Sequence, residues 1–139
     1  MFFSLILQLL DKVSSSEYDI AKWKADNALH PQAMNEHSVE WIFLVDSLNF
    51  SFWPDAGQEF TIHGEIGYWA LCAAVNRALE EKVPITEAKF YQNLSTEEAA
   101  HIFRTDQEGI TIPMLKERLQ VLHQNGKTLV EVKRRRRLM

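Results

Sequence analysis

The segment Gly67–Lys82 (G-Y-W-A-L-C-A-A-V-N-R-A-L-E-E-K) constrains the fold more than any other part of the chain. Its apolar residues recur at helical spacing, and Pro84, which cannot continue a helix, lies two residues after its end. We therefore expect a largely buried helix over these residues. Cys72 lies in the middle of this segment, and a cysteine in such surroundings is typical of a small core residue rather than of a nucleophile.

Short capping signals predict further helices. Ser95 and Glu98 form a capping box that begins one helix, and Asn35 is a candidate cap for another element. Pro113 is placed to lie in the first turn of a later helix, where its missing N–H costs nothing. Asn125-Gly126 is predicted to end that helix, and Leu129–Val132 to begin a new short apolar element.

Two segments are less clear from the pattern. The run Val39–Val45 is apolar without a clean period, so that a helix and a buried strand fit it equally well. Phe60–Glu65 suggests a short hairpin. The chain is therefore predicted to be mainly α-helical, with at most one small β-hairpin.

The N-terminal run Met1–Leu10 has the length of a signal-peptide core but lacks a basic flank and a small-residue cleavage site. It is also too short to cross a bilayer, and we expect a buried helix. A second capping box, Ser14 with Glu17, predicts another helix that carries Trp23. The single cysteine excludes an internal disulfide framework and favours a reducing compartment, which makes the cytoplasm the expected location.

Charge is distributed unevenly along the chain. Lys133–Arg137 holds five of the 15 basic residues, so residues 1–132 carry ten basic against 19 acidic side chains. An acidic body makes direct nucleic-acid binding unlikely, because a phosphate-backbone binder needs a basic face. The basic tail could direct nuclear entry or be a frayed end without a role, and both readings stay open.

Motifs for metal and phosphate binding are missing from the sequence. The five histidines are scattered without zinc-ligand spacing, and there is no glycine-rich phosphate loop, so we predict no metal and no cofactor. Two clusters mix aromatic and polar residues, at Ala21–Pro31 and Val45–Pro54. Such segments usually build core, but aromatic walls with a few polar groups also suit a flat heterocyclic ligand.

Four long stretches follow one another in the chain: W-K-x-x-N-x-L-H-P at Trp23–Pro31, V-E-W-I-F-L-V-D-S-L-N-F-S-F-W at Val39–Trp53, G-Y-W-A-L-C-A-A-V-N-R-A-L-E-E-K-V-P-I-T at Gly67–Thr86, and L-x-E-R-L-x-V-L-x-x-x-G-K at Leu115–Lys127. In this order they resemble one known family, the queuosine 5′-phosphate N-glycosylases of queuosine salvage. The resemblance covers roughly residues 20–132. Long motifs rich in aromatic residues make it specific.

The resemblance implies a helical domain related to helix-hairpin-helix DNA glycosylases. It implies hydrolysis of the N-glycosidic bond of queuosine 5′-monophosphate, which releases queuine for reuse in transfer RNA. Residues 1–132 would be the N-terminal part of such a domain and residues 133–139 a divergent basic tail. The catalytic carboxylates are expected in a C-terminal half that the chain lacks, so that we expect it to be catalytically incomplete and assign no catalytic residue.

The resemblance also suggests which residues bind substrate: Asn27, Asp46, Asn49 and Trp53. Asn27 stands where relatives carry a base-contacting histidine, and an amide can still donate and accept hydrogen bonds. Asp46, Asn49 and Trp53 would shape or brace the wall of a nucleobase pocket. The alternatives are a non-catalytic interaction module, which could self-associate through exposed apolar stripes, and a truncated product without function.

Overall fold

The computed structural model describes residues 4–8, 27–33, 35–54 and 57–139, which fall into two compact units, Met1–His30 and Pro31–Met139. In the first unit, residues 4–8 are helical as predicted, but Leu5, Ile6 and Leu7 are exposed, so the expected burial of this helix is not confirmed. The predicted capping box at Ser14 and the helix carrying Trp23 lie outside the described residues.

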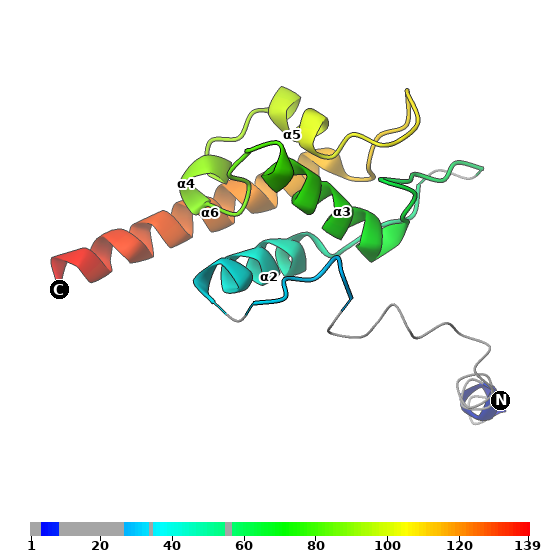
Figure 1. Cartoon of the computed structure of the whole chain (residues 1–139), viewed down its shortest axis with the longest axis horizontal. Helices are drawn as coiled ribbons and strands as arrows, with labels where there is room; N and C mark the ends of the chain where they lie inside the picture. The colour runs from blue at the N-terminus through cyan, green and yellow to red at the C-terminus, as the bar shows by residue number, and fades with distance from the viewer. Residues whose placement is uncertain (1–3, 9–26, 34, 55–56) are drawn as a thin grey trace. The chain divides into compact units, whose positions relative to one another are not determined.

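The second unit is a bundle of helices without a strand among its described residues. In chain order the helices are α2 (Glu36–Leu48), α3 (Gly67–Glu80), α4 (Ala88–Tyr91), α5 (Thr96–Ile102) and α6 (Leu115–Leu138). The long helix α6 contacts α2, α4 and α5, while α3 contacts α2 and α5 (Figure 1). The mainly helical prediction is confirmed, and the expected hairpin is reduced to one isolated bridge between Ile62 and Glu65. None of the described helices is long and apolar enough to span a membrane.

The ambiguous run Val39–Val45 belongs to helix α2. Asn35 caps this helix as predicted, since its side-chain oxygen accepts a hydrogen bond from the Ser38 N–H at 3.0 Å. The helix has apolar residues on both of its faces, which explains why the sequence shows no clean period. Its buried apolar residues are Trp41, Leu44, Val45 and Leu48, and its exposed ones are Val39, Ile42 and Phe43.

Helix α3 forms the centre of the core. Its residues from Trp69 to Val75 are all buried, including the free thiol of Cys72, as the sequence predicted. A side-chain hydrogen bond joins it to α2, because the Trp41 indole N–H donates to the Asn76 carbonyl oxygen at 2.8 Å. The tryptophan thus fills the core and pairs its one polar atom at the same time.

Helix α5 begins at the predicted capping box, with Ser95 and Glu98 each bonded to the other's backbone N–H. The start of α6, however, differs from the prediction. Pro113 lies in a turn, and Met114 adopts a left-handed conformation with φ of 56°, so the helix begins only at Leu115. The periodicity of the leucines predicted the helix but could not show the left-handed conformation of Met114 before it.

The prediction that Asn125-Gly126 ends a helix is wrong. Helix α6 continues through it to Leu138, so that Leu129–Val132 and the basic residues after it belong to the same helix. Gly126 lies where α6 crosses the end of α4, and a Cβ atom built on it would be 2.7 Å from the Gln92 Cα. Here glycine serves close packing between two backbones rather than helix termination.

Candidate functional site

The segment that follows α2 carries two of the predicted binding residues, Asn49 and Trp53. Its backbone leaves the helix irregularly: the Asn49 N–H bonds the Asp46 carbonyl oxygen at 3.4 Å, and the Phe50 N–H bonds the Leu48 carbonyl oxygen at 2.9 Å. Ser51 then adopts a positive φ of 48°, which is uncommon for a residue with a side chain. A loop of this kind needs contacts from elsewhere to hold one conformation.

Arg118 of α6 supplies those contacts. Its side chain is 0% exposed. The Nη2 group donates to the carbonyl oxygens of Phe50 at 2.6 Å and Ser51 at 2.9 Å. The Nη1 group donates to the Leu48 carbonyl oxygen at 2.5 Å, and Nε donates to that of Pro113 at 2.9 Å. One guanidinium therefore joins the end of α2, the loop after it and the start of α6.

Aromatic rings complete the surroundings of this guanidinium. Its central carbon lies 4.6 Å from the centre of the Phe50 ring and 5.2 Å from that of Phe52. The Phe52 ring in turn packs against Phe60, with 6.5 Å between the ring centres. Burial lowers the pKa of Arg118 to about 10, so it stays charged at neutral pH. Carbonyl dipoles and ring faces stabilise the cation, in place of a carboxylate.

Three of the four predicted binding residues lie on the surface of this region. Asp46 and Asn49 are exposed near the end of α2, and Trp53 is 83% exposed on the loop. Asn27 belongs to the first unit, where its side-chain oxygen accepts a hydrogen bond from the Leu29 N–H at 2.9 Å within a turn. The structure therefore brings together Asp46, Asn49 and Trp53 on one segment, and their ligand-binding role stays a prediction.

Two ionisable residues of α3, Tyr68 and Cys72, lie close enough to Asp46 to be affected by its charge. Burial raises the pKa of the Cys72 thiol to about 11, and the negative charge of Asp46 adds to this rise. Burial likewise raises the pKa of Tyr68, whose hydroxyl hydrogen-bonds with Cys72, and the charge of Asp46 contributes again. Both groups are thus neutral at physiological pH, which suits packing and hydrogen bonding and disfavours a role for Cys72 as a nucleophile.

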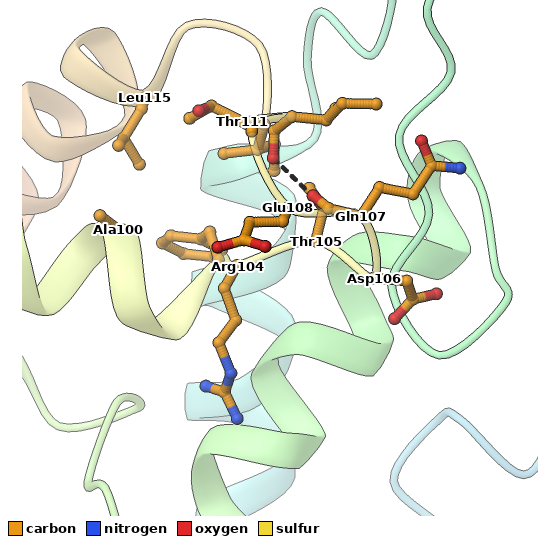
Figure 2. A pocket seen from close by; sticks show the side chains of 12 residues that line it. Ala100, Arg104, Thr105, Asp106, Gln107, Glu108, Thr111 and Leu115 are labelled. Carbon is orange, nitrogen blue, oxygen red and sulfur yellow. Dashed lines mark hydrogen bonds between the residues drawn. The ribbon is translucent and has the colours of Figure 1, made fainter.

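Three pockets are lined by residues outside this segment. The first, of about 400 Å³, is formed by the loop between α5 and α6, where the Thr105 hydroxyl donates to the Ile110 carbonyl oxygen at 2.6 Å (Figure 2). The second lies among α2, α4 and the end of α6, and the third between Lys82–Pro84 and α5. Asp46, Asn49 and Trp53 line none of these three pockets.

The loop beside the first pocket is fixed by Asp106. Its carboxylate accepts hydrogen bonds from the N–H groups of His63 at 2.9 Å and Gly64 at 2.8 Å. Because Gly64 and then His63 donate to the charged form, the pKa of Asp106 is below its usual value. The carboxylate thereby holds the turn that contains the isolated bridge.

Replacing Asp106 with asparagine should lower the Tm by about 2–4 °C at pH 7, because the charged acceptor is lost. A depressed folded-state pKa stabilises the fold above the unfolded pKa, and this contribution disappears as the pH falls through the folded value. The difference in Tm from the parent protein should therefore shrink below about pH 4. Calorimetry across pH checks this, with Glu108→Gln as the control on the same loop. A pH-independent difference would contradict the assignment.

In the described part of the chain, no group of three histidine, cysteine or acidic side chains is arranged around a common point that could hold a metal ion.

Arg118 was not predicted from the sequence, although one signal was present. Arg118 occupies a position on the apolar stripe of Leu115, Leu119 and Leu122, and an arginine on such a stripe must find buried acceptors.

Comparison with known proteins decides the family. The sequence profile described as "Queuosine salvage protein" matches residues 29–136. The chain belongs to the queuosine salvage protein family. The match begins within the Trp23–Pro31 motif and continues through most of α6, and it includes the whole Arg118-held segment.

Members of the queuosine salvage family from distant organisms are similar to this chain. Proteins named queuosine 5′-phosphate N-glycosylase/hydrolase are 41% identical in Bos taurus over 128 residues (88% of this chain, 37% of the relative) and 40% identical in Mus musculus (85% and 36%). A bacterial relative of the same name, from Sphaerobacter thermophilus, is 30% identical (91% and 38%). The chain therefore spans little more than a third of the length of the relatives that it matches.

Proposed function

We propose that this chain provides part of the base-binding wall of a queuosine 5′-phosphate N-glycosylase/hydrolase. The observation that carries the proposal is the exposed Trp53 on a loop that Arg118 fixes, inside the region matched by the family. An exposed indole on a rigid support offers a stacking surface for a flat base. Asn49 and Asp46 on the same segment would bind the polar edge of the base.

The proposed reaction is hydrolysis of the bond between the base and the ribose of queuosine 5′-monophosphate. Such a reaction builds positive charge on the ribose, and a positioned carboxylate stabilises that charge best where water is excluded. In the described residues, the buried charged side chains are Arg77 and Arg118, and no carboxylate is buried. We therefore propose that hydrolysis requires residues beyond those described, in agreement with the partial coverage of the relatives.

Incubation of the purified chain with queuosine 5′-monophosphate, followed by chromatographic detection of free queuine, tests the missing activity. We expect no release above the rate without protein, while a full-length relative at the same concentration should release queuine. Turnover comparable to that of the relative would contradict the proposal of incomplete catalysis.

Self-association is a second candidate, supported by the outer face of α2. Val39 is 66% exposed, and Ile42 and Phe43, which lie one turn further along the helix, are also exposed. A contiguous apolar face of this kind is typical of an interaction surface. Light scattering of the parent protein, with Ile42→Glu as the comparison, tests self-association. A parent that is monomeric at all concentrations would refute it.

The relation to helix-hairpin-helix DNA glycosylases and the cytoplasmic location also belong to this proposal. The helical architecture is compatible with the former, and the single buried cysteine with the latter. Both derive from the family resemblance and the composition.

A further inference from the structure

We infer that Arg118 is a positioning residue for substrate binding, which fixes the loop Asn49–Trp53 so that Trp53 and Asn49 face the base. The inference rests on the proposed function, since it concerns the same surface. It assigns a role in ligand binding to a side chain that lies inside the core and does not itself reach the surface.

The hydrogen bonds of Arg118 are concentrated on this loop. Three of its four carbonyl partners belong to Leu48, Phe50 and Ser51, which are the last residue of α2 and two residues of the loop. These carbonyl groups lie at the C-terminal end of α2 and in the irregular loop after it, and a planar guanidinium can bind several of them at fixed angles. An ammonium group would reach fewer of them, because its three donors radiate from one atom.

The backbone conformation of the loop requires such a support. Ser51 is held at a φ of 48°, and its own carbonyl group is one of those bound by the guanidinium. Phe50 and Phe52 pack their rings on the guanidinium from the same loop. Both neighbours of Ser51 therefore contact the guanidinium, and Trp53 directly follows the second of them, Phe52. Its exposed indole therefore stands on a loop that has little freedom to move.

Arg77 provides a matched comparison within the same unit. It is also buried, and its Nη2 group donates to the carbonyl oxygens of Ile102 at 2.9 Å and Arg104 at 2.8 Å. These bonds fix the end of α5, and they do not touch the loop after α2. A change at Arg77 therefore reproduces the loss of a buried arginine without the loss of the Trp53 support.

The test compares Arg118→Lys with Arg77→Lys in the full chain by two measurements. Hydrogen exchange of the amides in residues 49–53 reports the loop, and calorimetric titration with queuosine 5′-monophosphate reports binding. In Arg118→Lys, we expect exchange in residues 49–53 to rise at least about tenfold and Kd to increase about tenfold, as a loss of pre-organisation predicts. Arg77→Lys should leave both unchanged.

The exchange and binding measurements together distinguish a failure of the Arg118 inference from a failure of the proposed function. Unchanged exchange in Arg118→Lys, or faster exchange with an unchanged Kd, would overturn the inference. A parent protein that does not bind queuosine 5′-monophosphate would overturn the proposed function, while the exchange data would still decide whether Arg118 fixes the loop. If Arg118→Lys does not fold, Phe50→Leu, which removes one ring from the guanidinium, should change both measurements in the same direction; no change in either would overturn the inference.

Discussion

Replacing Gly126 with alanine should lower the free energy of unfolding by about 1–3 kcal/mol, as expected for overpacking at a close contact. The new methyl group would lie 2.7 Å from both the Cα and the Cβ atoms of Gln92 and 2.8 Å from its backbone nitrogen. Because these atoms belong to or adjoin the backbone of α4, a side-chain rotation cannot relieve the clash. The intrinsic helix propensity of alanine, which exceeds that of glycine, acts in the opposite direction and is too small to compensate.

Urea denaturation measures this effect, with Lys127→Ala as the matched control on an exposed position of the same helix. The control should change stability by less than about 0.5 kcal/mol. A stabilised Gly126→Ala protein would show that α6 and α4 are farther apart than described, and that the glycine has no role in their packing.

Replacing Trp41 with alanine should have the largest effect on stability, a loss of about 3–5 kcal/mol. The indole is 5% exposed between α2 and α3, and its N–H donates to Asn76 at 2.8 Å. The substitution therefore leaves a large cavity and removes a hydrogen bond between two helices at once. Since a domain of this size is stable by only about 5–15 kcal/mol, much of its stability would be lost.

Trp53 offers the control for this experiment, because it is the same residue type in the opposite environment. At 83% exposed, it has few neighbours to lose, and Trp53→Ala should change the free energy of unfolding by less than about 0.5 kcal/mol. Equal losses of stability in the two variants would contradict the packing described for α2 and the loop.

Local signals in the sequence were sufficient for much of the fold. Ser95 with Glu98 and Asn35 were identified as caps because the atoms that form a cap lie within four residues of one another. Helix α3 was predicted because its apolar residues recur at helical spacing and Pro84 lies shortly after it. Gly126 was misread because the same residue type serves both helix ends and close crossings, and only the position of α4 distinguishes them.

The candidate site was less predictable, because it depends on contacts between residues that are far apart in the sequence. The family resemblance suggested Asp46, Asn49 and Trp53 as binding residues, and that role stays a prediction. The structure places all three on or beside one loop. The sequence could not show that Arg118 holds the loop, because the bond to Leu48 spans 70 positions. A buried arginine is visible only once α2 and α6 have packed together.

We propose that this chain binds the base of queuosine 5′-monophosphate on the surface that carries Trp53. Calorimetric titration of the nucleotide into the parent protein and into Trp53→Ala tests this binding, after the stability of the variant has been shown to be unchanged. Loss of a stacking indole should raise Kd about 5- to 150-fold, corresponding to about 1–3 kcal/mol per stacked base. Equal Kd values for the two proteins, or the absence of binding by the parent, would contradict the claim.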